Sequence, residues 1–403
     1  MILVLGVGIV GKAVIEYFLQ KGEEICFFDD QIKHLSSYPD IPSFDLKDQK
    51  QWSKIKLVIA SPGFALQHDI IQEAIRKHIS ITNDIGLFLA QKRRGLNIGI
   101  TGTNGKSTVC ALLKHILGDR AEIGGNFGVS PLKFQDVDFY IIELSSYQLE
   151  LLEVEDLYDL EIGVIVNIYP NHLTRHGSFE DYAAAKCRIL SAKNKFLGHC
   201  PLFQEPGWDL PKASLTAQLP ESKLFEKEEY QYAWGLVELI LDSLKIDKNE
   251  ARVKAASYEV LPFRQQVIRT DPIMIINDSK SSNSIAVKQA LKNVKEAIVW
   301  IAGGIDHSDW SSFDEYKHKI KKAFIYGTNS QELVDMCEKE GIVYDIFNNL
   351  EQTVPKALDF SIENKIDLLF SPGYASFDQF KNFEERGEKF NNYIDTYFNN
   401  INR

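Results

Sequence analysis

Short apolar runs alternate with longer mixed stretches along this chain, and most of the runs end in a turn that contains glycine. An apolar run bounded by turn residues is typical of a strand buried on both faces of a parallel sheet. The predicted strands lie at residues 2–5, 24–28, 56–60, 96–101, 138–143, 162–167, 273–276, 297–302, 323–326 and 367–370. Helices are expected between them, for example at 108–117. The pattern predicts an α/β protein of three doubly wound domains, at 1–92, 93–261 and 262–403.

Composition narrows the class of protein. The chain has 403 residues, 44% of them hydrophobic and 25% charged, which is ordinary for a globular protein of two or three domains. Its net charge of −11 argues against a general nucleic-acid binder. The five cysteines show no C-x-x-C spacing, and no secretory signal or membrane-length apolar run is visible. We therefore expect a cytoplasmic protein that binds neither nucleic acid nor membranes. A monomer is a separate expectation, which does not follow from the composition.

A phosphate-binding loop lies between the strand at 96–101 and the helix that follows it. Its backbone N–H groups and the helix N-terminus would cradle a polyphosphate, Lys106 would reach the terminal phosphates, and Ser107 or Thr108 would hold Mg²⁺. A surface turn rich in small residues is the alternative. The residues predicted to bind the nucleotide, ATP or GTP, are Gly102, Thr103, Asn104, Gly105, Lys106, Ser107 and Thr108. The middle domain is thus predicted to be of the P-loop ATPase type.

The first domain opens with a strand, the glycine pattern Gly6-x-Gly8-x-x-Gly11, and a second strand that ends in Asp29 and Asp30. That order is typical of a Rossmann-like dinucleotide site and, taken alone, predicts a dehydrogenase. The glycines could instead merely allow close packing of strand and helix. A turn at residues 61–63 follows the third strand, at the sheet edge where open α/β sheets bind ligands.

A carboxylate, Glu143, ends the predicted strand at 138–143. There it could meet the Mg²⁺ of a nucleotide held by the loop of the neighbouring strand. Further along, Ser178 and Asp181 have the spacing of a helix N-cap, which predicts that a helix carrying Lys186 begins there.

The chain resembles the Mur ligases over nearly its whole length, and among them it most resembles the members that add D-glutamate. The matching stretches are Thr101–Thr108, Gly125–Gly128, Glu143–Glu150, Asn277–Lys280 and Ser371–Gly387. The first and third are shared with folylpolyglutamate ligases, whereas the last is far more specific to the D-glutamate-adding members.

The resemblance implies a reaction and a set of catalytic residues. ATP would phosphorylate the carboxylate of UDP-MurNAc-L-alanine, and the amine of D-glutamate would attack the acyl phosphate. Two anions must meet, so metal ions and cations have to screen them. By resemblance, His172 holds a second Mg²⁺ and Lys186 is carbamylated, although a lone histidine is commonly a loop residue and a lysine on a helix commonly faces solvent. The implied catalytic residues are Lys106, Glu143, His172 and Lys186, and the implied metal ligands are Ser107, Glu143, His172 and Lys186 as its carbamate.

The same resemblance implies the binding residues. Ile9, Val10, Asp29 and Asp30 would contact the uracil and diphosphate, Asn126 the muramoyl part, and Arg264 and Lys280 the nucleotide or acyl phosphate. Ser282, Ser376 and Phe377 would hold D-glutamate, with Phe383 beside them. Ser376 could equally be a helix N-cap.

Some residues depart from the family pattern. His307 stands where many relatives have a lysine for D-glutamate, and we expect it to take the place of that lysine. Residues 229–233 replace an asparagine motif near the end of the central domain. Three alternative functions remain open: another Mur or folylpolyglutamate-type amide ligase, an NAD-dependent oxidoreductase built on the Gly6–Gly11 turn, or a non-catalytic nucleotide-binding protein.

Overall fold

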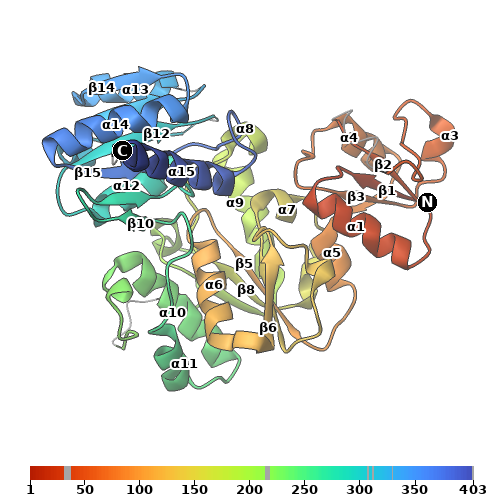
Figure 1. The fold of residues 1–403 in the computed structure, drawn as a ribbon. Helices are drawn as coiled ribbons and strands as arrows, with labels where there is room; N and C mark the ends of the chain where they lie inside the picture. The colour runs from red at the N-terminus through yellow and green to blue at the C-terminus, as the bar shows by residue number, and fades with distance from the viewer. Residues whose placement is uncertain (31–37, 214–217, 306–307, 311–312, 329, 402–403) are drawn as a thin grey trace. The chain divides into compact units, whose positions relative to one another are not determined.

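The computed structural model describes residues 1–30, 38–213, 218–305, 308–310, 313–328 and 330–401. Residues Met1–Tyr258 form one compact unit and Glu259–Arg403 form a second. Among the described residues, the first unit contains two sheets and the second contains one, and a helix lies between most successive strands (Figure 1). The predicted fold class, α/β with three doubly wound parts, is confirmed.

A four-stranded parallel sheet with the order β2-β1-β3-β4 forms the N-terminal part. Apolar side chains pack on both of its faces. Its strands are β1 (Ile2–Leu5), β2 (Ile25–Phe28), β3 (Leu57–Ala60) and β4 (Ser80–Thr82), and its helices are α1 (Ile9–Gln20), α3 (Gln49–Trp52), α4 (Asp69–Arg76) and α5 (Asp84–Leu89).

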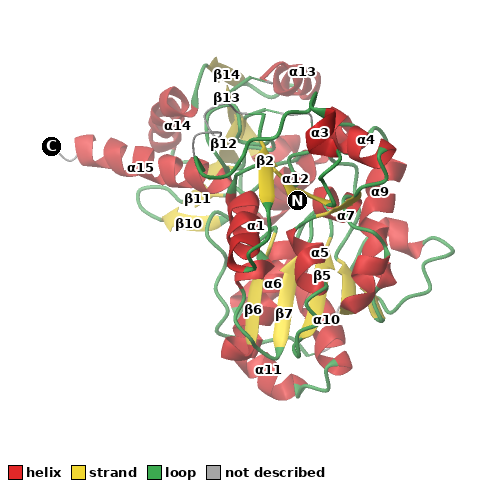
Figure 2. Cartoon of the chain, turned by 90° about the vertical axis from the view of Figure 1, so that its right-hand side faces the viewer, coloured by secondary structure: helices red, strands yellow, loops and turns green. Residues whose placement is uncertain are grey.

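The central part is a five-stranded parallel sheet with the order β6-β7-β5-β8-β9. Figure 2 shows β6, β7 and β5 side by side. Its strands are β5 (Leu96–Thr101), β6 (Ala121–Gly125), β7 (Phe139–Glu143), β8 (Leu160–Ile165) and β9 (Asn194–Leu197). Its helices are α6 (Lys106–Leu117), α7 (Ser146–Glu150), α8 (Leu173–His176), α9 (Phe179–Cys187), α10 (Glu228–Ser243) and α11 (Lys248–Ala255). Because the carboxyl ends of parallel strands share one edge, the loops after β5, β7 and β8 all emerge at that edge.

The second unit contains a six-stranded sheet with the order β10-β11-β15-β12-β13-β14. Only β10 runs antiparallel to its neighbour among these strands. The strands are β10 (Gln266–Arg269), β11 (Ile275–Asn277), β12 (Ile298–Gly303), β13 (Ile320–Tyr326), β14 (Tyr344–Phe347) and β15 (Asp367–Phe370), and the helices are α12 (Ser284–Asn293), α13 (Ser330–Glu340), α14 (Leu350–Asn364) and α15 (Phe383–Ile401).

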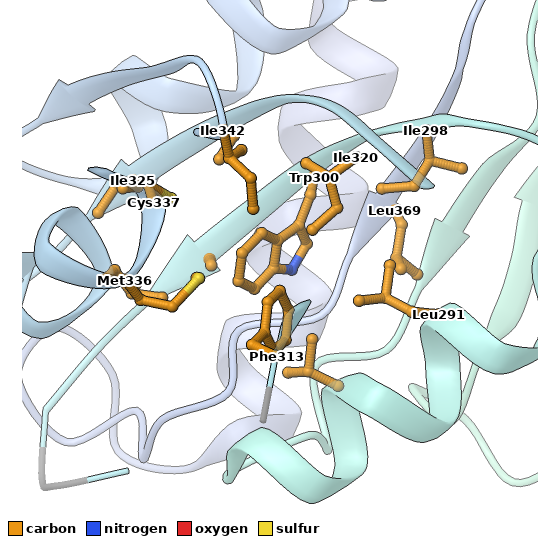
Figure 3. Packing of buried hydrophobic residues seen from close by; sticks show 14 of the residues in the cluster. Leu291, Ile298, Trp300, Phe313, Ile320, Ile325, Met336, Cys337, Ile342 and Leu369 are labelled. Carbon is orange, nitrogen blue, oxygen red and sulfur yellow. The ribbon is translucent and has the colours of Figure 1, made fainter. Parts of the chain in front are cut away.

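Burial on both faces explains the uninterrupted apolar runs. On β12, Trp300 and Ala302 pack into one core and Val299 and Ile301 into another, because successive side chains of a strand point to opposite faces. Figure 3 shows Trp300 packed beside Phe313 and between strand and helix residues of the first of these cores. A strand placed between two such layers has no solvent-facing side and therefore shows no polar alternation.

Two predicted element boundaries and one predicted helix cap differ from the structure. The helix after the phosphate loop begins at Lys106, two residues before the predicted start at Thr108. Strand β8 ends at Ile165, so Asn167 lies in the loop beyond it. The residues after Ser376 form a turn and helix α15 begins at Phe383, so Ser376 is not a helix N-cap.

Among the described residues, no helix combines the length and the apolar character needed to cross a bilayer.

Candidate active site

The phosphate loop connects β5 to α6 and has a conformation that depends on glycine. Gly102 has φ 154°, and a Cβ there would lie 2.9 Å from the Cβ of Val166. Gly105 has φ 81° at the N-cap of α6. Both values fall in the left-handed half of the map, which side chains disfavour. Helix α6 begins at Lys106, directly after this turn, so its first backbone N–H groups lie at the loop.

Two residues that sequence reasoning did not select hold this loop from outside. Asn167 accepts from the backbone N–H of Asn104 through Oδ1 (2.9 Å) and donates through Nδ2 to the Asn104 carbonyl (3.1 Å). The hydroxyls of Thr103 and Tyr182 lie 2.9 Å apart. Both supports come from loops or helices more than sixty positions away in the chain. No local motif marks them.

Two lysines meet at one backbone carbonyl beneath the loop. Lys106 Nζ donates to the Gly102 oxygen at 2.9 Å, and Lys186 Nζ donates to the same oxygen at 2.8 Å. Lys186 is only 2% exposed, so the expectation that a helical lysine faces solvent does not hold here. Burial, with the nearby Lys106 charge, lowers the pKa of Lys186 well below its usual value. The two predicted catalytic lysines therefore lie together.

The predicted carboxylate, Glu143, is buried at the end of β7. Asn126 donates from Nδ2 to Glu143 Oε1 at 2.7 Å, and its backbone N–H donates to the Glu143 carbonyl at 2.8 Å. In this structure Asn126 thus orients the carboxylate, and its predicted contact with the muramoyl group stays a prediction. Ser107 and Thr108 are buried at the start of α6.

His172 lies at the start of α8 with φ 55°, and its ring centroid is 5.0 Å from that of Tyr147. Burial and the charges of Lys186 and Lys106 lower its pKa to about 3, so the imidazole is neutral at pH 7. Within the described residues, its buried Nδ1 has no hydrogen-bond partner. A neutral imidazole with an unused nitrogen is suited to a metal ion.

The four predicted metal ligands offer a hydroxyl, a carboxylate, an imidazole and an amine. Oxygen ligands suit Mg²⁺, so Ser107 and Glu143 fit that ion directly. No group of three or more His, Cys, Asp or Glu side chains in the described part of the chain is arranged to hold a metal. The predicted set does not depend on such a group, because it includes a serine and a modified lysine.

The predicted binding residues of the N-terminal sheet surround its glycine turn. Gly11 is required there, since a Cβ would lie 1.7 Å from the Gly6 carbonyl oxygen. Asp29 Oδ2 accepts from the backbone N–H of Val7 at 2.8 Å and so holds the turn. Asp30 is exposed and lies 3.4 Å from the His68 ring nitrogen. At the turn, Ile9 is exposed and Val10 is half-buried.

In the second unit, Lys280 lies over the ring of Phe383, 3.6 Å from its centroid. Arg264 is half-buried and its charge acts on Asp278. Ser376 is buried, whereas Ser282 and Phe377 are exposed. His307 lies outside the described residues, so its predicted role with D-glutamate stays a prediction. The structure brings together Lys280 and Phe383 from this predicted set.

The fold and the loop define an α/β protein whose central sheet carries a glycine-dependent loop and a helix N-terminus at the carboxyl edge of its strands. The family model of the Mur ligase middle domain matches residues 100–197, and that of the MurD-like N-terminal domain of Mur ligases matches residues 1–83.

Curated relatives match nearly the whole chain. UDP-N-acetylmuramoylalanine–D-glutamate ligase of Rickettsia bellii is 32% identical, covering 96% of this chain and 95% of the relative. The protein of the same name from a Hydrogenobaculum species is 31% identical, covering 87% and 90%. The chain belongs to the Mur ligase family, which confirms the predicted family and the predicted ligase class.

Solved structures support the fold. The UDP-N-acetylmuramate–alanine ligase of Thermotoga maritima aligns with a TM-score of 0.58 at 15% identity, over 98% of this chain and 99% of that one. The MurF ligase of Thermotoga maritima in complex with ADP aligns with a TM-score of 0.59 at 14% identity, over 98% and 95%.

Proposed function

We propose that this chain joins D-glutamate to UDP-N-acetylmuramoyl-L-alanine, with conversion of ATP to ADP and phosphate, in peptidoglycan precursor synthesis. The observation that carries the proposal is the pair of lysines on the Gly102 carbonyl, beside a phosphate loop and a buried carboxylate. The names of the full-length relatives support the choice of substrates. Asp29 is engaged with the glycine turn itself, and the family model that matches residues 1–83 is that of a Mur ligase N-terminal domain, which favours the ligase over a dehydrogenase.

The first step activates a carboxylate. An oxygen of the L-alanine carboxylate attacks the terminal phosphorus of ATP, the bond to ADP breaks, and an acyl phosphate forms. The loop N–H groups and Lys106 bind the transferred phosphate and offset its growing charge. Mg²⁺, held by Ser107 and Glu143, would supply further positive charge at the phosphates. Asn126 keeps Glu143 oriented for that task.

Lys186 is proposed to act as its carbamate. Its lowered pKa provides the neutral amine that can attack CO₂; the new N–C bond forms, one proton is released, and an anion results. The carbamate, with His172, would hold a second Mg²⁺. A carbamate also carries no positive charge that would repel Lys106 at the shared carbonyl.

The second step forms the peptide bond. The uncharged amine of D-glutamate attacks the acyl carbon and a tetrahedral intermediate forms. The nitrogen then gives up one proton to the solvent, and phosphate leaves with the bonding electrons. D-Glutamate is proposed to lie against Ser282, Ser376 and Phe377, and Arg264 and Lys280 to reach the nucleotide or acyl phosphate. The uracil and diphosphate would occupy the glycine turn at Gly6–Gly11. The first domain thus anchors the long substrate and the central domain activates it.

The test is phosphate release measured with each substrate omitted in turn. The proposal predicts release that requires both UDP-MurNAc-L-alanine and D-glutamate. Turnover with a different amino acid in place of D-glutamate would favour another amide ligase of the family. The absence of turnover with any amino acid would favour a non-catalytic nucleotide-binding protein.

A further inference from the structure

A cluster of buried polar side chains lies beside the predicted metal-binding residues and has no part in the proposed chemistry. Arg175 donates to Glu150 Oε1 from Nη2 (2.5 Å) and from Nε (3.0 Å). His176 Nδ1 lies 3.2 Å from Glu150 Oε2, and its Nε2 lies 3.0 Å from the Ser146 hydroxyl. The side chains of Arg175, Glu150 and His176 are 13%, 8% and 3% exposed. The guanidinium also lies 4.5 Å from the centre of the Tyr147 ring.

The N–H groups of Arg175 that do not bind Glu150 face the turn at residues 62–64 of the N-terminal part. Its Nη1 donates to the carbonyl of Gly63 at 3.2 Å, and the second N–H of its Nη2 is shared between the carbonyls of Pro62 (3.2 Å) and Phe64 (2.8 Å). Three successive carbonyls of the turn after β3 are thus bound by one side chain from the central part. Since the guanidinium is a planar group with five donors, no other side chain can make this set of contacts.

That turn packs against the glycine turn where the UDP group is proposed to bind. The backbone N–H of Ser61 donates to the Leu5 carbonyl at 3.0 Å, and its hydroxyl lies 3.4 Å from the Gly6 carbonyl. A Cβ on Gly6 would lie 3.2 Å from the Phe64 ring, so the two turns are in contact. A shift of the turn at 61–64 would therefore shift the glycine turn.

On the other side, Arg175 is tied to the predicted metal-binding histidine. The backbone N–H groups of Arg175 and His176 both donate to the His172 carbonyl at 3.1 Å. Glu150 ends helix α7, which begins three residues after Glu143. The cluster therefore joins the segments that carry His172 and Glu143 to the turn at 61–64.

We propose that Arg175 is a positioning residue that fixes the distance between the UDP-binding turns and the phosphate-transfer site. This inference rests on the proposed function. UDP-MurNAc-L-alanine is long, and its reacting carboxylate lies at the end opposite to the uracil. Anchoring one end brings the other end to the phosphate only if the two sites are held in register, and a misplacement of about 1 Å can lower the rate roughly 100-fold.

The experiment compares a substrate that uses both sites with one that uses only the second. D-Glutamate-dependent phosphate release is measured for the full-length enzyme with UDP-MurNAc-L-alanine and with MurNAc-L-alanine that lacks UDP. We expect Arg175→Ala to lower kcat/KM for the UDP substrate by about 30- to 100-fold, with the UDP-free substrate affected by less than about 3-fold. The KM for ATP should change less than about 2-fold, because the phosphate loop is not touched.

Two further variants separate positioning from folding. Arg175→Lys keeps the charge and much of the aliphatic chain but not the planar guanidinium with its five N–H donors. We expect it to lower kcat/KM about 10-fold with the UDP substrate, and not with the UDP-free substrate. Arg93→Ala is the matched control, because Arg93 also donates to a backbone carbonyl, that of Phe134 at 2.7 Å, and lies 5.3 Å from the centre of the Phe88 ring. It should lower both activities equally or not at all.

An equal loss with both substrates in the Arg175 variants would overturn the positioning role, and so would unchanged turnover in Arg175→Ala. Those outcomes leave the proposed function intact, since the wild type still turns over. Absence of D-glutamate-dependent release by the wild type would instead remove the proposed function and the positioning role together.

Discussion

Replacing Asn167 by alanine removes the side chain that holds the phosphate loop from outside. Two hydrogen bonds are lost, at 2.9 and 3.1 Å, and both connect Asn167 to the backbone of Asn104. The Thr103 N–H bond to the Asn167 carbonyl remains, because it uses the main chain. At a net value of about 1 kcal/mol for each bond, the ordered loop is destabilised by roughly 2 kcal/mol.

If that free energy has to be supplied when nucleotide orders the loop, Kd for a non-hydrolysable ATP analogue rises by about 30-fold. Titration calorimetry on the full-length protein measures this directly. Asn97→Ala is the control, because Asn97 is a buried asparagine on neighbouring β5 whose side chain donates to the Asp159 carbonyl at 3.1 Å, at the opposite end of that strand. A Kd for Asn167→Ala within about 2-fold of the wild type, in a folded protein, would refute the reasoning.

Three other changes test separate parts of the account. Lys186→Ala should lower the ligase activity about 100-fold or more, and high bicarbonate should not change the activity of the variant. Full activity of the variant would refute the proposed role of the carbamate. Burial raises the pKa of Asp278 to about 7, so the folded state holds a proton that the unfolded state releases near pH 4. The stability contributed by that proton is complete below pH 4 and is lost as pH rises through 7. The free energy of unfolding of the wild type should therefore fall by up to about 4 kcal/mol between pH 4 and 8, and Asp278→Asn should remove this fall. A variant with the same pH profile of unfolding as the wild type would contradict the shift. Gly102→Ala should raise the Kd for the ATP analogue about 10-fold or more, because the new Cβ is strained and meets Val166. Gly8→Ala, where nothing lies within 4 Å of the new Cβ, should leave that Kd unchanged, and equal effects would contradict the strain argument.

Residues that are close together in sequence were sufficient to predict the phosphate loop, the position of Glu143 and the helix of Lys186. The phosphate loop depends on glycines, a lysine and hydroxyls in one continuous stretch, and Glu143 is placed by the strand that it ends. The helix that carries Lys186 begins where the Ser178 cap predicted it, since the Ser178 hydroxyl accepts from the Asp181 N–H. Such features are fixed by neighbours in sequence and can be predicted from sequence alone.

The remaining features depend on contacts between distant segments. Asn167 and Tyr182 support the loop across 63 and 79 positions of sequence separation, and neither residue type is unusual where it stands. The burial of Lys186 follows from packing under the loop rather than from the composition of its helix. The antiparallel edge strand β10 was missed because only two of its four residues, Gln266–Arg269, are apolar and none of them is buried. Arg175 could not be selected, because the carbonyls of residues 62–64 that it binds belong to a turn of a different sheet, more than a hundred positions away in the chain.

The central claim is that the enzyme activates the substrate carboxylate by phosphoryl transfer. The most direct measurement uses UDP-MurNAc-L-alanine with heavy oxygen in that carboxylate, turned over with ATP and D-glutamate, followed by mass spectrometry of the released phosphate. Transfer of the carboxylate oxygen to phosphorus predicts one heavy oxygen in each phosphate released. Phosphate that carries only the oxygens of ATP and water would contradict the account.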